Sequence, residues 1–142
     1  MAISSSLTKS VLIVEDEQSI RDILVELFEV NDNVVTSAEF LPDALERLRT
    51  QRFDLVVTDL RLGGKRDGGL QVMALAGMLS PDAQVLVLTA YPDDSNRQAS
   101  VRLGALHFLE KPVDLAVIAQ FAAGAGVRTA IPVPPHLIAS DA

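Results

Sequence analysis

The chain has 142 residues, of which 49% are hydrophobic, and it carries a formal net charge of -7 with no cysteine. This length fits one domain with a buried core. The lack of cysteine excludes disulfides and thiolate metal sites. The excess of acidic residues argues against direct nucleic-acid binding. No stretch approaches the roughly 18–20 apolar residues of a membrane span, and residues 1–6 lack a signal-peptide pattern, so we expect a soluble cytoplasmic protein.

Short apolar runs alternate with segments of helical spacing along most of the chain. Runs typical of buried strands occupy residues 11–14, 34–36, 55–58, 85–88 and 105–109. Helices are expected at about residues 20–28, 42–48, 70–79 and 93–103, and from about 113 until Gly124. Asp16 or Ser19 is expected to cap the first helix. Five strands alternating with five helices predict a parallel sheet with helices on both faces.

Composition also predicts the limits of the folded domain. We expect one domain over residues 10–125, preceded by an N-terminal tail over 1–9 and followed by a Pro-rich tail over 126–142, which we expect to be loose from residue 128 onward. A Gly-rich loop follows the third strand, and within it Asp67-Gly68-Gly69 is interpreted as a turn.

Chemically active side chains stand where four of the predicted strands end. Glu15 and Asp16 follow the first strand, Asp59 ends the third, Thr89 ends the fourth, and Lys111 lies just after the fifth. Ligands bind beyond the carboxyl ends of parallel strands, so these groups are expected to converge on one crevice. Clustered carboxylates suit Mg²⁺, and a carboxylate can itself act as a nucleophile toward a phosphoryl group.

Four segments in this order carry a family resemblance: residues 11–17, 55–60, 87–90 and 108–112. Together they make residues 10 to 123 resemble the receiver domains of two-component response regulators, the CheY-like family. The resemblance implies a flavodoxin-like (βα)5 fold, a doubly wound five-stranded parallel sheet with strand order 2-1-3-4-5. It also implies a cytoplasmic phosphoprotein that acts in phosphorelay signal transduction.

The resemblance assigns a role to each residue of the crevice. Asp59 is the expected phosphoacceptor. Asp16 is the expected direct Mg²⁺ ligand, together with Asp59 and the backbone carbonyl of Arg61, while Glu15 is expected to reach the metal through water. Thr89 and Lys111 are the expected pair that assists catalysis and senses the phosphoryl group.

Further positions match the switching parts of the family. Phe108 falls at the aromatic switch position and is expected to move with Thr89. The Lys111-Pro112 peptide bond is expected to be cis, a geometry common only before proline. Arg61 and Tyr91 fall at positions that tune the lifetime of the phosphoryl group, and both are bulky here.

The implied function is a switch rather than an enzyme with turnover. A sensor histidine kinase or a phosphotransfer protein is the expected donor to Asp59. Phosphorylation is then expected to change the surface of the fourth helix, fifth strand and fifth helix, which selects a protein partner or a homodimer. The domain is expected to promote its own phosphorylation and its slow dephosphorylation, without contacting nucleic acid or membrane.

Three alternative functions fit the sequence less well. An aspartate-nucleophile phosphatase of the haloacid dehalogenase type would need Asp-x-Asp after the first strand, whereas Asp59-Leu60-Arg61 follows the third and lacks the second acid. A cobalamin-binding module would need a histidine in that segment. A receiver that serves as an unphosphorylated scaffold is disfavoured by the intact set of acids, Thr89 and Lys111.

Overall fold

The computed structural model describes residues 8–30, 32–62, 68–90, 93–112 and 114–134. Five parallel strands form one sheet in the order β2-β1-β3-β4-β5. The strands are β1 (Ser10–Val14), β2 (Val34–Ala38), β3 (Leu55–Asp59), β4 (Gln84–Thr89) and β5 (His107–Glu110). The helices are α1 (Gln18–Phe28), α2 (Leu41–Thr50), α3 (Gly68–Leu79), α4 (Asp94–Arg102) and α5 (Leu115–Gly124). The predicted fold class and strand order are confirmed.

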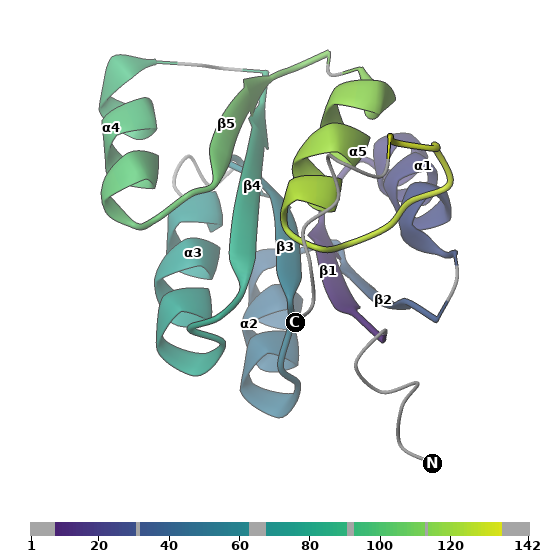
Figure 1. Ribbon diagram of the computed structural model, residues 1–142. Coiled ribbons are helices and arrows are strands. Elements are labelled where there is room, and N and C mark those ends of the chain that lie inside the picture. The colour runs from purple at the N-terminus through teal and green to yellow at the C-terminus, as the bar shows by residue number, and fades with distance from the viewer. Residues whose placement is uncertain (1–7, 31, 63–67, 91–92, 113, 135–142) are drawn as a thin grey trace.

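Two hydrophobic clusters hold α2 and α3 on one face of the sheet and α1 and α5 on the other (Figure 1). Side chains alternate between faces along a strand, so Leu12 and Val14 pack with α2 and α3, while Val11 and Ile13 pack with α1 and α5. All five residues of β3 are buried, as expected for a central parallel strand. The end of β3 is therefore held firmly from both sides.

Helix α1 begins without a side-chain cap. Its N-cap residue is Glu17, whose side chain makes no capping hydrogen bond, so the expectation that Asp16 or Ser19 caps this helix is wrong. Ser19 already lies inside the first turn, and Asp16 precedes the cap position. The carboxylate of Asp16 instead belongs to the cluster described below.

Helix α3 begins earlier than predicted. Gly68 and Gly69 are its first two residues and are buried, so the interpretation of these glycines as part of a turn is wrong. A Cβ atom on Gly69 would lie 2.4 Å from the carbonyl oxygen of Asp59 and 2.7 Å from the Cα of Leu60. Glycine is needed here because the helix backbone approaches the end of β3 too closely for any side chain.

The segment after α5 packs against the domain as far as Ile131. Val127 is fully buried, and the backbone N–H of Ala130 donates to the carbonyl of Leu27 at 2.8 Å. The side-chain amide of Asn33 donates to the carbonyls of Phe28 and Arg128, both at 2.9 Å. The expectation of a loose tail from residue 128 is therefore wrong as far as Ile131, which packs partly buried against the same cluster, and residues 135–142 lie outside the described part of the chain. Two apolar side chains that precede Pro132, those of Val127 and Ile131, supply this packing.

The described part of the chain contains no helix that is both long enough and apolar enough to cross a membrane.

Candidate functional site

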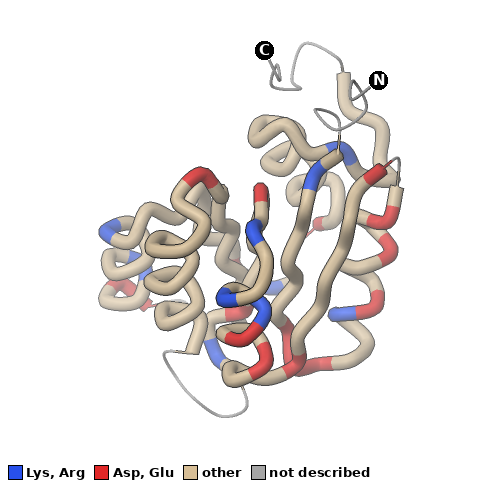
Figure 2. The backbone as a smooth tube through the Cα atoms, turned by 90° about the horizontal axis from the view of Figure 1, so that it is seen from below, with Lys and Arg blue, Asp and Glu red and all other residues tan. Residues whose placement is uncertain are grey.

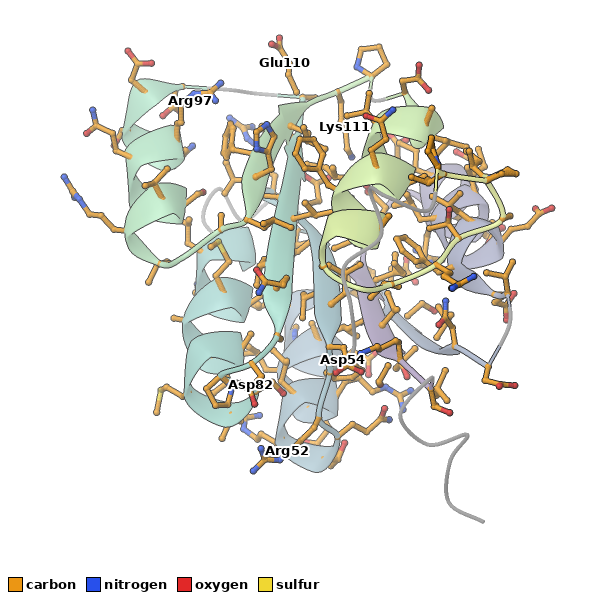
Figure 3. All side chains as sticks on the ribbon, viewed as in Figure 1. Arg52, Asp54, Asp82, Arg97, Glu110 and Lys111 are labelled. Atoms are coloured by element: carbon orange, nitrogen blue, oxygen red, sulfur yellow. The ribbon has the colours of Figure 1, made fainter. Side chains whose placement is uncertain are left out.

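Three carboxylates and one ammonium meet where the strands end. Oxygen atoms of Glu15, Asp16 and Asp59 all lie within 4.8 Å of one another. The Lys111 ammonium donates to Glu15 Oε1 at 2.5 Å and to Asp59 Oδ2 at 2.9 Å. Figure 3 shows Lys111 at the upper end of the sheet, away from Asp54 at the lower end. The predicted convergence of residues distant in sequence is thus present for these four side chains.

Glu15 is the most deeply buried member of the cluster, with only 1% of its side chain exposed. Its Oε2 accepts a hydrogen bond from the Glu17 backbone N–H at 3.1 Å. Burial raises the pKa of Glu15 above its ordinary value of 4.5, despite the hydrogen bonds from Lys111 and Glu17 that favour the charged form. Burial lowers the pKa of Lys111, but its hydrogen bonds to Glu15 and Asp59 outweigh that effect and leave it raised above 10.5.

Asp59 ends β3 with both carboxylate oxygens engaged. Oδ2 accepts from Lys111, and Oδ1 accepts from the backbone N–H of Arg61 at 3.3 Å. The residue is 9% exposed, so its carboxylate is still reached from solvent. The orientation of this carboxylate is therefore set by two donors that come from different parts of the chain.

Thr89 lies at the same edge of the sheet but is fully buried. Its carbonyl accepts from the backbone N–H of Lys111 at 2.7 Å, which joins the end of β4 to the segment after β5. The Lys111-Pro112 peptide bond is cis, as expected. The structure brings Thr89 to the backbone of Lys111.

Phe108 packs in the hydrophobic cluster of α2 and α3 and is 8% exposed. The guanidinium carbon of Arg97 on α4 lies 4.7 Å from the centroid of its ring, within the range of a cation–π contact. Tyr91, the second residue expected to tune phosphoryl lifetime, lies outside the described residues.

A cavity of about 740 Å³ adjoins the carboxylates and extends between α1 and α5. Its polar wall contains Glu15, Asp16, Glu17, Asp59, Arg61 and Lys111. Its apolar wall contains Ile20, Ile23, Leu24, Leu88, Ala90, Pro112, Leu115 and Ile118. Amphipathic spacing in α1 does not distinguish core residues from residues that line a cavity, and 49% of Ile23 is exposed beside this one.

The donor set fits a divalent cation. Three carboxylates outnumber the single ammonium, so the ionised cluster keeps an excess of negative charge. Oxygen ligands are those that Mg²⁺ and Ca²⁺ prefer, and Mg²⁺ is commonly held by only one or two carboxylates and water. In the part of the chain that the structure describes, Lys and Arg lie among Asp and Glu on several elements (Figure 2).

Comparison of the sequence with known families gives one match over most of the chain. The family profile described as a response regulator receiver domain matches residues 11–123. The acid tolerance regulatory protein ActR of Sinorhizobium medicae is 35% identical over 107 residues, covering 75% of this chain and 54% of ActR. The response regulator protein PilR of Pseudomonas aeruginosa is 35% identical over 115 residues, covering 80% of this chain and 25% of PilR. The chain thus spans about half of one relative and a quarter of the other.

Solved structures give the same result. A response regulator protein from Burkholderia pseudomallei, with a phosphorylated aspartic acid, calcium ion and citrate, is similar with a TM-score of 0.71 and 30% identity, covering 82% of this chain and 68% of that one. The beryllofluoride-activated NtrC4 receiver domain dimer is similar with a TM-score of 0.68 and 27% identity, covering 82% of this chain and 92% of that one.

Proposed function

The chain belongs to the response regulator receiver domain family of two-component systems, and from this premise we propose that Asp59 is its phosphoacceptor. The carboxylate of Asp59 supports this role because it stands at the end of β3, 2.9 Å from the Lys111 ammonium and within 4.8 Å of oxygens from Glu15 and Asp16. This single arrangement combines a reachable nucleophile, a fixed positive charge and ligands for a cation.

In the proposed reaction, an oxygen of Asp59 attacks the phosphorus of a phosphohistidine on a sensor kinase or phosphotransfer protein. The new O–P bond forms as the P–N bond to the donor breaks, and the released imidazole nitrogen becomes free to take a proton. Lys111 offsets negative charge on the phosphoryl oxygens, and the Arg61 N–H keeps the Asp59 carboxylate oriented. Mg²⁺, held by Asp16, Asp59 and the Arg61 carbonyl, with Glu15 acting through water, would supply further charge neutralisation.

The product is proposed to act as a switch rather than a turnover enzyme. A dianionic phosphoryl group on Asp59 would attract the Lys111 ammonium and the Thr89 hydroxyl. The backbones of Lys111 and Thr89 are already joined by a hydrogen bond. Movement of Thr89 would allow the Phe108 ring, which is already buried in the structure, to change its packing and so alter the surface of α4, β5 and α5. Phosphorylation shifts this equilibrium only by binding one state better than the other.

The altered surface is proposed to select a partner protein or a second copy of the chain. Dimerisation is supported by the similar NtrC4 receiver, which is described as a dimer in its activated form. We further propose that Arg61 and Tyr91 shield the acyl phosphate from water and slow its hydrolysis. A cytoplasmic location is part of the proposal, because transfer requires direct contact with a kinase supplied with ATP.

The folded unit is proposed to extend past the boundary at residue 125 that composition suggested. Its support is the full burial of Val127 and the hydrogen bond from Ala130 to Leu27.

The chemistry is tested with radiolabelled acetyl phosphate as the donor. We expect label to be incorporated in the presence of Mg²⁺ and to be released by hydroxylamine, which cleaves acyl phosphates, whereas EDTA should largely prevent incorporation. The absence of label with Mg²⁺, or equal incorporation in EDTA, would contradict the proposal.

A further inference from the structure

Arg21 contacts the acidic pair although no sequence motif marked it. Its Nη1 donates to the backbone carbonyl of Glu15 at 2.9 Å, and its Nη2 lies 4.0 Å from Oε1 of Glu39. Only 15% of the Arg21 side chain is exposed, whereas 48% of Glu39 is exposed. An ion pair of this length with an exposed partner contributes little by itself, so the hydrogen bond to Glu15 is the contact that matters here.

The accepting carbonyl belongs to the peptide unit that joins Glu15 to Asp16. A peptide unit is planar, so fixing its oxygen restricts the direction in which both flanking residues leave it. The N–H of Glu15 is also fixed, because it donates to the Ala38 carbonyl at 3.1 Å. Arg21 thus holds the backbone carbonyl of Glu15, and Ala38 holds its backbone N–H. Lys111 and the Glu17 N–H hold the Glu15 carboxylate.

We propose that Arg21 is a positioning residue for the cation site, because it holds the Glu15-Asp16 peptide so that both carboxylates face Asp59. The inference rests on the proposed function in one respect, since it takes the carboxylate cluster to bind a divalent cation. It adds a residue that is not itself an oxygen ligand. Residues that orient metal ligands commonly change metal affinity by about 10–100-fold when they are removed.

An electrostatic role and a positioning role of Arg21 predict opposite changes in cation affinity when this residue is replaced. The guanidinium is positive and lies beside the acidic pair, so simple loss of its charge would strengthen the attraction for a cation. Loss of its hydrogen bond would instead release the peptide and weaken cation binding. The sign of the change in affinity therefore separates a positioning role from a purely electrostatic one.

The experiment uses Mn²⁺ as the probe, with free Mn²⁺ measured by electron paramagnetic resonance on the full chain. We expect Arg21→Gln to raise the dissociation constant about tenfold or more. Arg21→Lys keeps the positive charge but loses the planar guanidinium with its several N–H donors, and should give an intermediate dissociation constant. Arg47→Gln is the matched control, because Arg47 pairs with Asp43 on the exposed surface of α2 and its loss changes net charge equally.

A second readout distinguishes positioning from general loss of structure. The rate of phosphorylation by acetyl phosphate in the Arg21→Gln variant should recover toward that of the unaltered chain as Mg²⁺ is raised to saturation. Urea unfolding in EDTA checks that each variant is folded; if Arg21→Gln is not, Arg21→Lys carries the test. Unchanged or tighter Mn²⁺ binding in the folded variant would overturn the inference.

The unaltered chain separates this outcome from failure of the proposed function. If it binds Mn²⁺ and accepts a phosphoryl group while the Arg21 variants bind equally well, the role of Arg21 alone is rejected. If the unaltered chain neither binds Mn²⁺ nor accepts label, both the cation site and the role of Arg21 are rejected.

Discussion

The Nζ atom of Lys111 lies 2.9 Å from Oδ2 of Asp59, although 52 positions of sequence separate the two residues. The same ammonium also contacts Glu15, so one positive charge is shared between two carboxylates of the cluster. Removing one partner from a buried ion pair usually costs more than the pair contributes, because the other charge is left uncompensated. Lys111 therefore serves both the stability of the resting site and the charge balance of the proposed reaction.

The buried carboxyl of Glu15 predicts a pH-dependent effect of the Glu15→Gln substitution. Because its pKa is raised in the folded state, Glu15 binds its proton more tightly folded than unfolded. The free energy of unfolding contributed by Glu15 therefore falls as the pH rises from 4.5 through its higher folded pKa. Glutamine does not titrate, so the stability of the variant relative to the unaltered chain should increase over this pH range.

Urea unfolding in EDTA at a series of pH values measures this difference. Glu26→Gln, which makes the same chemical change at an exposed residue on α1, is the matched control. A relative stability of Glu15→Gln that stays constant or falls with increasing pH would contradict the assignment.

The close approach of α3 to β3 predicts opposite effects at two glycines of the same helix. Gly69→Ala should destabilise the fold by about 1–3 kcal/mol, because the new Cβ would overlap the backbone of Asp59 and Leu60. Gly77→Ala should stabilise it by about 0.5–1 kcal/mol, since the added methyl group meets open space in a helix. Urea unfolding measures both, and equal effects would show that the contact at Gly69 does not restrict the helix.

The packed segment after α5 predicts a cost for truncating Val127. Val127→Ala should lower the free energy of unfolding by about 1–3 kcal/mol, because it removes fully buried methyl groups from the α1 and α5 cluster. Val101→Ala makes the same chemical change at a side chain that is 65% exposed and should stay within about 0.5 kcal/mol. Similar small effects at both positions would indicate that the segment is not part of the core.

The contact between Arg97 and Phe108 predicts a measurable coupling energy. A double-mutant cycle with Arg97→Met and Phe108→Leu should give about 0.5–1 kcal/mol, the range of cation–π contacts at exposed positions. A parallel cycle with Arg102→Met, an exposed residue at the end of the same helix, is the control and should give a value near zero. Equal coupling in the two cycles would exclude a specific contact between Arg97 and the Phe108 ring.

The sheet and most of the candidate site could be predicted because their signals are local. Buried parallel strands appear as short apolar runs, and the residue after each run marks the edge where the site forms. Glu15, Asp16, Asp59 and Lys111 were found in this way, and their clustering follows from the parallel topology alone.

Other features depend on contacts that leave no local pattern. Arg21 resembles any charged residue of an amphipathic helix, and its role appears only when its distance to the Glu15 carbonyl is known. Gly69 looks like part of a turn until its contact with the Asp59 backbone is seen. Val127 stands near prolines that suggest a loose tail, and only tertiary packing shows that it is buried.

The most direct test of the account is the intact mass of the chain after incubation with acetyl phosphate and Mg²⁺. The unaltered chain should gain the mass of one phosphoryl group, and so should Asp82→Asn, which alters an exposed carboxylate at the opposite end of the sheet (Figure 3). Asp59→Asn should remain at its starting mass. Phosphorylation of folded Asp59→Asn to the same extent as the unaltered chain would contradict the assignment of Asp59 as the acceptor.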